Sequence, residues 1–580
     1  MLRKIAQSVR EYKTPSLLTF LFILAEAVIE VFIPYTTATL VNNIKDSVPI
    51  GEVLKTGGIL IVMAVASLSC GGIAAVTCAK ASAGFAKNLR RDLFSRVQTY
   101  SFENIDKFST SSLVTRMTTD VTNVQMSFMM IIRTAIRAPL MLIFCIVMVA
   151  YMGGVLAFSF AVVIPVLAIG LFLVARNAMP AFRRVFKKYD KLNESIEENV
   201  RGMRVVKGFS REEHEKTKFG VASEDIAADF TKAERIVALN SPLMQFCMNF
   251  NMVFVMLVGS YLVITYSGSV IGVGEISAML TYGVQILIQL MMLSMIYVML
   301  TMSGESMKRI VEVLEEESSL TNPPAPVYSI ADGSIDFEGV SFKYSKKAEK
   351  YALSDIDLHI DSGMTVGIIG GTGSSKSTLV SLIARLYDVS VGACKVGGVD
   401  VRDYDLDTLR AGVGMVLQKN LLFSGTIAEN LRWGNENATD EELIEACRLA
   451  CAHDFVTSFP DGYETKIEQG GTNVSGGQKQ RLCIARALLK RPKILILDDS
   501  TSAVDTKTDA QIRAGFAAYI PETTKIIIAQ RISSVEHADM IIVMDNGKIA
   551  DRGTHEELLS RCDIYREVYS QQTGGEQNGK

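Results

Sequence analysis

The sequence has little net charge and few of the residue patterns that bind metals or form disulfides. Its 59 Lys and Arg residues nearly balance its 62 Asp and Glu residues, and the formal net charge of -3 argues against nucleic acid as the main partner. None of the nine cysteines forms a CxxC pair that would indicate zinc, and none lies in a segment expected outside the cell. This usage favours reduced, buried thiols.

Apolar residues, in contrast, are abundant and unevenly distributed. They make up 49% of the 580 residues, and nearly all long uncharged runs precede Ser303, which predicts at least two domains of different character. A bilayer core needs about 20 mainly apolar residues as helix. Six stretches qualify: Ser16–Val41, Gly57–Ala79, Ser127–Met152, Val155–Ala175, Pro242–Ile264 and Ile276–Thr301.

The region before the first stretch is basic, as in a signal peptide, but the apolar run that follows has no small-residue cleavage site. We therefore expect an amphipathic lead-in helix over residues 1–15 and a transmembrane domain over residues 16–314. Two long connections, Lys80–Met126 and Arg176–Ser241, are rich in Lys and Arg, whereas the three short connections carry almost none. Because cytoplasmic loops favour Lys and Arg, both termini are predicted to be cytosolic, in a multi-pass protein of the cytoplasmic membrane, which we expect to be a bacterial plasma membrane.

Both long connections keep apolar periodicity, and no proline occurs between Ala83 and Gln125. The membrane helices are therefore expected to continue into the cytosol and turn back there.

Polar residues inside the apolar stretches are candidate functional groups. Glu26 and Glu30 share one helix face, roughly 15–20 Å along the first stretch. Carboxylates within a membrane are costly and usually face the bundle interior or water. They predict either a site for cationic substrates or protons, or a structural pairing with Arg133 or Arg137.

The fifth and sixth stretches are rich in methionine, whose flexible thioether suits a cavity that accepts many shapes. The alternatives are a substrate path that includes nearby amides, or ordinary packing and lipid contact. The amides are Gln245, Asn249, Gln285 and Gln289.

Residues 315–333 contain three prolines and read as a linker, followed by a soluble domain over residues 334–570 and a disordered tail over residues 571–580. The apolar strand Thr365–Ile369 leads into a P-loop and the helix Leu379–Leu386. Such a loop turns backbone N–H groups and a helix N-terminus toward phosphates. It consists of Gly370, Gly371, Thr372, Gly373, Ser374, Ser375, Lys376, Ser377 and Thr378. Lys376 would reach the β- and γ-phosphates of a nucleotide, and Ser377 would bind Mg²⁺.

Further motifs narrow the class. Residues Val474, Ser475, Gly476, Gly477 and Gln478, about a hundred residues after the P-loop, resemble the signature motif of ATP-binding cassettes (ABC). The buried strand Ile494–Asp498 resembles the Walker B strand, which ends in the aspartate that holds Mg²⁺. Gln418 resembles the Q-loop glutamine, which is a catalytic residue of the family and joins Ser377 and Asp498 as an Mg²⁺ ligand. Tyr344 resembles the aromatic residue that stacks on adenine, and Ser502–Asp505, with Asp505 at its end, resembles the D-loop.

With these motifs in order, the chain resembles exporter-type ABC transporters over essentially its whole length. The resemblance implies an all-α six-helix transmembrane domain of the type I exporter kind with long intracellular loops, fused to an α/β P-loop nucleotide-binding domain. It also implies short coupling helices, near Asp106–Ser112 and Phe209–Glu213, and binding of ATP and Mg²⁺.

Three positions depart from the family pattern. Ser375 stands where glycine is usual before the P-loop lysine. Asp499 stands where the family has its catalytic glutamate; its carboxylate is about 1.5 Å shorter in reach, and a misplacement near 1 Å can cost about 10²-fold in rate. Gln530 stands where the family has its switch histidine; it can hydrogen-bond a γ-phosphate but cannot carry a proton. The site is therefore predicted to bind ATP and hydrolyse it poorly.

In this family two cassettes stack head to tail, so that each ATP lies between one P-loop and the other signature motif. A homodimer would contain two poor sites, so we predict a second, different half-transporter chain as partner. Ser475, Gly476 and Gly477 of this chain would complete the partner's site. The chain thus resembles the degenerate-site subunit of bacterial heterodimeric multidrug exporters, with an amphipathic, drug-like or lipid substrate and membrane lipids as surroundings. The alternatives are a slow homodimeric exporter or lipid flippase, and an ATP-gated regulatory or channel protein.

Overall fold

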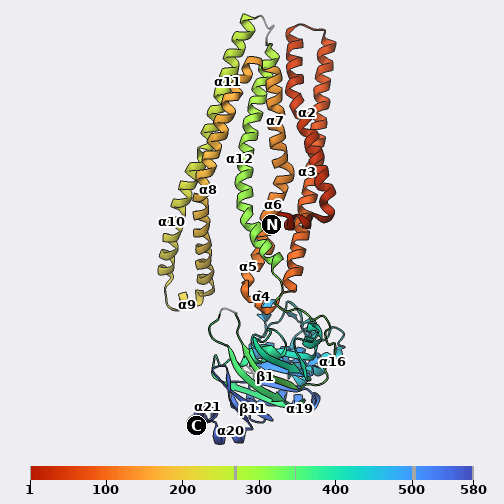
Figure 1. The fold of residues 1–580 in the computed structure, drawn as a ribbon, viewed down its shortest axis with the longest axis vertical. Coiled ribbons are helices and arrows are strands. Elements are labelled where there is room, and N and C mark those ends of the chain that lie inside the picture. The colour runs from red at the N-terminus through yellow and green to blue at the C-terminus, as the bar shows by residue number, and fades with distance from the viewer. Residues whose placement is uncertain (1, 267–270, 346–347, 500–504, 578–580) are drawn as a thin grey trace. The chain divides into compact units, whose positions relative to one another are not determined.

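The computed structural model describes residues 2–266, 271–345, 348–499 and 505–577. The chain forms two compact units (Figure 1). The first unit comprises Met1–Gln98 and Ser109–Glu316, and the second comprises Thr99–Phe108 and Glu317–Lys580. A ten-residue segment of the N-terminal half, 99–108, therefore packs with the C-terminal half.

In the described residues of the first unit, every regular element is a helix. Its elements are α1 Leu2–Ala6, η1 Gln7–Tyr12, α2 Lys13–Lys45, α3 Ile50–Gln98, α5 Thr110–Thr115, η2 Arg116–Asp120, α6 Val121–Met130, η3 Ile131–Ala135, α7 Ile136–Met152, η4 Gly154–Leu156, α8 Ala157–Arg201, α9 Met203–Gly208, α10 Glu212–Ala238, α11 Asn240–Thr265 and α12 Val273–Glu315. Within the described ranges, six helical stretches are long and apolar enough to cross a membrane. The predicted six-helix transmembrane domain is confirmed.

The two long connections are helical, as expected from their periodicity. Helix α3 continues without interruption to Gln98 and α8 continues to Arg201, and α10 then returns along α8 (Figure 1). The η3 segment is a π-helix just before Pro139, which has no N–H to bond the carbonyl four residues earlier.

The short helices in these connections lie earlier than the family pattern placed them. The first is α4, Phe102–Lys107, and not Asp106–Ser112. It begins at Ser101, whose side chain accepts a bond from the Asn104 N–H while the Asn104 side chain accepts one from the Ser101 N–H. This Ser–Asn pair differs from the usual Ser/Thr and Glu/Gln capping pattern. The second, α9, ends at Gly208, before the predicted Phe209–Glu213.

A row of polar contacts, called the polar seam below, joins η2 and α6 to the antiparallel α12. Ser306 Oγ donates to Asp120 Oδ1 at 2.8 Å, and Arg309 Nε donates to Asp120 Oδ2 at 2.8 Å. Asp120 is only 1% exposed, so these partners replace the water that its carboxylate loses on burial. Further contacts of the seam join Ser127 to Ser303, Asn123 to Ser306, and Arg116 to Glu312.

The second unit is built on two main sheets. Its strands are β1 Ile335–Phe342, β2 Leu353–Ile360, β3 Thr365–Gly370, β4 Val391–Val396, β5 Val399–Asp400, β6 Val413–Val416, β7 Gly425–Thr426, β8 Lys466–Ile467, β9 Ile494–Asp498, β10 Thr524–Ile528, β11 Met540–Asp545 and β12 Lys548–Gly553. The larger sheet has the order β12-β11-β3-β10-β9-β6, in which only the edge strand β12 is antiparallel. The smaller antiparallel sheet has the order β2-β1-β4-β5, and β7 and β8 form a separate pair. This mixed α/β fold confirms the predicted domain class.

The helices of this unit cover the sheets. They are α4, α13 Lys376–Ile383, α14 Leu406–Gly412, α15 Ile427–Arg432, α16 Asp440–Leu449, α17 His453–Ser458, α18 Gly476–Leu489, α19 Thr506–Tyr519, α20 His555–Arg561 and α21 Asp563–Gln577, with single 3₁₀ turns at Gly462–Glu464, Gln469–Gly471 and Ile532–Ser534. Residues 571–577 of the tail, predicted as disordered, belong to α21. One reason is that the Gln572 side chain bonds the backbone of the loop that follows β10. It accepts from the Ile532 N–H and donates to the Gln530 carbonyl, both at 2.8 Å.

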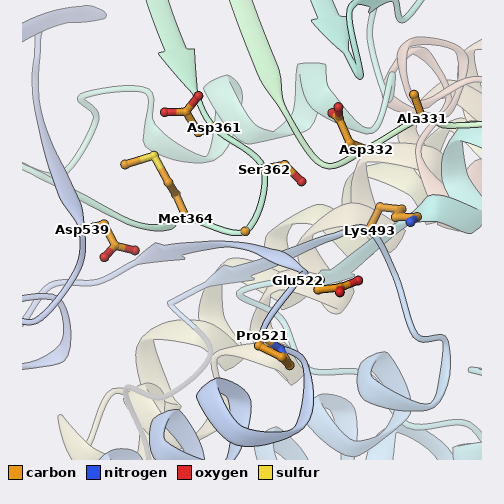
Figure 2. Close-up of a pocket in the computed structure, with 10 residues that line it drawn as sticks. Ala331, Asp332, Asp361, Ser362, Met364, Lys493, Pro521, Glu522 and Asp539 are labelled. Atoms are coloured by element: carbon orange, nitrogen blue, oxygen red, sulfur yellow. The ribbon is translucent and has the colours of Figure 1, made fainter.

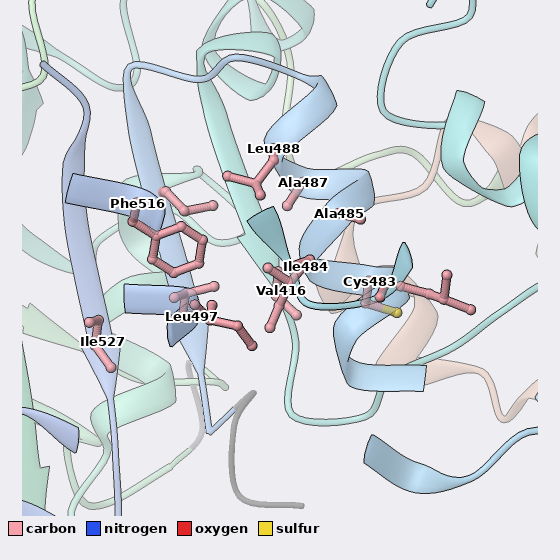
Figure 3. Packing of buried hydrophobic residues seen from close by; sticks show 14 of the residues in the cluster. Val416, Cys483, Ile484, Ala485, Ala487, Leu488, Leu497, Phe516 and Ile527 are labelled. Carbon is pink, nitrogen blue, oxygen red and sulfur yellow. The ribbon is translucent and has the colours of Figure 1, made fainter. Parts of the chain in front are cut away.

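Strands β9 and β10 are buried along their whole length, as expected for parallel strands covered on both faces. On one face, Val416, Leu497 and Ile527 pack against residues of α18 and α19 (Figure 3). The contacting side chains include Cys483, Ile484, Leu488 and Phe516. This packing fixes the carboxyl edge of the sheet, where ligands bind in open α/β folds.

Candidate nucleotide-binding site

The P-loop follows β3 at the carboxyl edge of the sheet. A side chain at Gly370 would lie 2.2 Å from the Met544 carbonyl oxygen, and Gly373 has φ +84°, so both positions require glycine. The Lys376 ammonium donates to the carbonyls of Gly370 and Gly371 at 2.8 and 2.9 Å, and burial lowers its pKa. The loop therefore holds a cation above the N-terminus of α13, where a phosphate chain would be stabilised.

Ser375 occupies a backbone conformation that disfavours a side chain. It precedes α13 with φ 71° and ψ 26°, in the left-handed region, and its hydroxyl makes no capping bond. Residues with a Cβ pay about 1–2 kcal/mol in this region. The serine at this position is thus strained, which explains why glycine is usual there.

Asp498 and Ser377 meet where an Mg²⁺ ion would be held. Asp498 ends β9 and is 5% exposed; burial raises its pKa, and a hydrogen bond with the Ser377 side chain opposes that shift. A hydroxyl and a carboxylate fit Mg²⁺, which takes few protein ligands and completes its shell with phosphates and water. Within the described ranges, no group of three or more His, Cys, Asp or Glu residues forms a self-sufficient metal site.

The two departing positions, Asp499 and Gln530, are in direct contact. Gln530 Nε2 donates to Asp499 Oδ2 at 2.8 Å, and the Gln418 side chain also hydrogen-bonds the Asp499 carboxylate. Burial raises the pKa of Asp499, while these two amides and the nearby Lys376 lower it. Asp499 has φ 47°, a conformation that aspartate tolerates better than most residues. The structure thus brings three predicted catalytic residues, from the ends of three neighbouring strands, into one cluster.

The signature residues form a second helix N-terminus. Ser475 caps α18, accepting from the Gln478 N–H at 3.3 Å, while Gln478 Oε1 accepts from the Ser475 N–H at 2.9 Å. Ser475 and Gly476 are exposed and Gly477 is partly so, which leaves this N-terminus open to a ligand from outside the chain. Asp505 caps α19, and the other D-loop positions, 502–504, lie outside the described residues.

Tyr344 lies beside the P-loop helix. Its hydroxyl is 2.8 Å from Thr378 Oγ1, and its ring packs edge-on against Phe342 and Tyr387. The residue is 49% exposed, so a base can reach it.

The polar residues predicted inside the membrane helices do not form a single cluster. Arg137 Nη2 lies 2.5 Å from Glu30 Oε2 and 3.5 Å from Glu26 Oε1, which is the structural pairing considered as an alternative. Gln245 donates to Asn249 on α11 at 3.3 Å, and Gln285 on α12 accepts from Cys145 Sγ at 3.3 Å.

A small cavity of about 130 Å³ lies between α11 and α12. Among the described residues, one of the four predicted amides, Asn249, lines this cavity. The lining residues are Met248, Asn249, Asn251, Met252, Leu280, Gly283 and Val284.

A larger hollow, of about 770 Å³, lies at the opposite edge of the sheet from the motifs. Its lining residues precede or begin β1, β3, β9, β10 and β11, and include Asp332, Asp361, Lys493, Glu522 and Asp539 (Figure 2). Because the phosphate-binding elements follow the strands, this hollow is not the nucleotide site.

Two residues at the site were not predicted. Tyr387 lies in the turn after α13, and Gln572 lies in the tail. Each contacts partners that lie far away in the sequence, and neither belongs to a local motif that would have identified it.

Comparisons with known proteins agree with this geometry. The family model of the ABC transporter transmembrane region matches residues 16–291, and that of the ABC transporter matches residues 353–502. The uncharacterized ABC transporter ATP-binding protein YfiB of Bacillus subtilis is 34% identical over 575 residues, 99% of each chain. A fatty acid ABC transporter ATP-binding/permease protein of Mycobacterium bovis is 33% identical over 480 residues, 83% of this chain and 75% of that protein.

A solved structure shares the fold. The structure of a bacterial Atm1-family ABC exporter with ATP bound has a TM-score of 0.82 and covers 97% of this chain and 98% of its own, at 23% sequence identity.

Proposed function

The chain belongs to the ABC transporter family and has the fold of its exporters, and we propose that it is the slowly hydrolysing half of a heterodimeric exporter. Family membership makes it a multi-pass membrane protein whose ABC domain binds ATP and couples its hydrolysis to transport.

One observation carries the proposal: the Asp499–Gln530 contact at 2.8 Å. A residue that orients or activates water must present a free carboxylate at the right distance. Here the shortened carboxylate is engaged by the amides of Gln530 and Gln418, and neither amide can accept or carry a proton. Lys376 and Ser377, the residues proposed to bind the phosphates and Mg²⁺, in contrast retain the residue types of the family pattern. The site therefore holds ATP but lacks the groups that accelerate water attack.

Each residue has a role in binding. The P-loop N–H groups and Lys376 hold the β- and γ-phosphates, Tyr344 stacks on adenine, and Gln418 contacts the γ-phosphate side of the site. Ser377 and Asp498, with Gln418, hold Mg²⁺, which neutralises charge on the phosphates when bound.

The partner would be a second half-transporter with glutamate and histidine at the two departing positions. Its catalytic site would be completed by Ser475, Gly476, Gly477 and Gln478 of this chain, which form an exposed helix N-terminus in this structure. Both termini would be cytosolic, as the basic long connections indicate.

The transported molecule is proposed to be amphipathic, a lipid or a drug-like compound. Support comes from the methionine-rich α11 and α12 and from the relative that is named a fatty acid transporter. The pairing of Glu26 and Glu30 with Arg137 favours a structural role for these carboxylates over a site for cationic cargo.

The proposal is tested with the full-length chain, purified alone in lipid nanodiscs. We expect ATP binding with turnover near background. The double variant Asp499→Glu/Gln530→His should raise turnover by up to about 10²-fold. The same double variant carrying Asp498→Asn is the matched control and should remain inactive. Brisk turnover and transport by the unmodified chain alone would instead support a homodimeric exporter or flippase. Nucleotide-dependent conductance without transport would support a channel or regulatory role.

A further inference from the structure

Helix α4 belongs structurally to the nucleotide-binding unit, although its neighbours in sequence, α3 and α5, belong to the other unit. The Asn104 side chain donates to the Glu317 carbonyl at 3.0 Å and accepts from the Ser319 N–H at 3.2 Å. Ser101 Oγ lies 2.7 Å from Ser319 Oγ. These bonds fix the N-terminal end of α4 on the segment that enters the second unit.

Helix α4 also contacts a cluster of aromatic rings, called the aromatic bridge below. It is formed by Phe102, the first residue of α4, together with Phe342, Tyr344 and Tyr387. The Tyr387 hydroxyl donates to Asp106 Oδ2 at 2.7 Å, and its ring centroid lies 6.1 Å from that of Phe102. Tyr387 also packs against Phe342 at 5.6 Å and edge-on against Tyr344 at 5.2 Å. Tyr387 is thus in contact with both α4 and the residue proposed to stack on adenine.

The position of Tyr387 in the chain strengthens this link. Helix α13 starts at Lys376, in the P-loop, and the turn that follows it carries Tyr387. The buried Arg385 holds this turn: its Nε donates to Asp388 Oδ1 at 2.8 Å and its Nη2 donates to the Thr321 carbonyl at 3.2 Å. The first bond closes the turn and the second ties it to the segment before β1, so Tyr387 is carried on a held backbone beside Asp106 and Tyr344.

We propose that Tyr387 couples occupancy of the adenine position on Tyr344 to the docking of α4. The inference rests on the proposed role of Tyr344 but not on a slow site or a heterodimer. Coupling between two positions is reciprocal: if a base on Tyr344 changes how α4 is held, weakening the hold on α4 changes the affinity for the base by the same factor. The aromatic bridge contacts the P-loop through the Tyr344 hydroxyl, which lies 2.8 Å from Thr378 Oγ1, and neither a change at Tyr387 nor one at Asp106 removes this contact. We therefore expect phosphate affinity to be independent of those two residues.

This separation gives the test. In the full-length chain in nanodiscs, affinities for ATP and for inorganic tripolyphosphate, which has no base, are measured by calorimetry or by displacement of a fluorescent ATP analogue. Tyr387→Phe removes only the hydroxyl that donates to Asp106. We expect ATP affinity to fall about 5-fold or more, the lower end of typical coupling, and tripolyphosphate affinity to stay unchanged. Asp106→Ala, on the exposed face of α4, removes the acceptor and should reproduce the effect without endangering the fold.

Tyr519→Phe is the matched control, because the Tyr519 hydroxyl also donates to a carboxylate, Glu445 Oε2 at 3.4 Å, away from the site. It should alter neither affinity. Equal loss of affinity for both ligands in Tyr387→Phe would show a merely structural role, and unchanged ATP affinity in both Tyr387→Phe and Asp106→Ala would refute the coupling.

A second readout follows α4 directly. Amide hydrogen exchange over residues 99–108 should change when ATP binds to the unmodified chain, and that change should be lost in Tyr387→Phe. Tyr344→Leu separates the two assignments. If this variant discriminates ATP from tripolyphosphate as the unmodified chain does, adenine does not stack there and the premise fails. If it loses that discrimination while Tyr387→Phe keeps it, the premise holds and the coupling is refuted.

Discussion

Replacing Ser375 with glycine should stabilise the nucleotide-binding unit. Ser375 is held at φ 71° and ψ 26° and gains no capping bond from its hydroxyl in return. Relief of the left-handed conformation contributes about 1–2 kcal/mol, and the greater freedom of glycine in the unfolded chain removes about 0.5–1 kcal/mol of that gain. The net expectation is a stabilisation of about 0.5–1 kcal/mol.

The single tryptophan of the chain provides the assay. Trp433 lies in the second unit, where its ring stacks on Phe423 with centroids 4.2 Å apart, so its emission reports unfolding of that unit in the full-length protein. Urea titration in detergent should move the midpoint upward by about 0.3 M for Ser375→Gly, given typical denaturant slopes.

The matched control is Ser381→Gly in the same helix. Ser381 has ordinary helical geometry and its hydroxyl donates to the Ser377 carbonyl at 2.6 Å, so glycine there should destabilise by about 0.5 kcal/mol. Opposite shifts for the two serine-to-glycine changes are the expected result. A lowered midpoint for Ser375→Gly would mean that strain at this position is not what the backbone angles indicate.

Two further predictions concern ion pairs. Arg309→Met should destabilise the helical unit by about 1–3 kcal/mol, because it leaves the buried Asp120 without its cation, and pairing it with Asp120→Asn should recover part of the loss; thermal aggregation in detergent measures both. His359 lies between Asp336 and Asp361, whose hydrogen bonds raise its pKa above 6.5. The stability that it contributes is fully present below pH 6.5 and is lost as pH rises through the higher pKa of the folded state. The Trp433 midpoint should therefore fall over this range, and His359→Asn should flatten the profile.

Local signals in the sequence were enough to predict much of the fold and the site. The long apolar runs predicted the six membrane-crossing helices, and the strand Ile494–Asp498 was predicted with the bounds that the structure has. The motifs that follow β3, β6, β9 and β10 could be brought together because parallel strands end at one edge of a sheet.

Features that depend on distant contacts could not be predicted in this way. The position of α4 depends on an unusual Ser101–Asn104 cap and on bonds to the backbone at Glu317 and Ser319. Tyr387 and Gln572 were missed because their partners lie far away in sequence. Asp499 and Gln530 were predicted separately from their positions in the motifs. Only the fold shows that the two side chains are hydrogen-bonded to each other.

The polar seam between α6 and α12 has a mechanical consequence. Apolar helix faces can slide over one another by a helical turn, about 5.4 Å, and repack. Asp120, however, has donors from both Ser306 and Arg309, and shifting α12 by one turn would take both away while the carboxylate remained buried. This polar joint therefore resists sliding of the two helices along their axes. An axial displacement of one helix is expected to move the other with it.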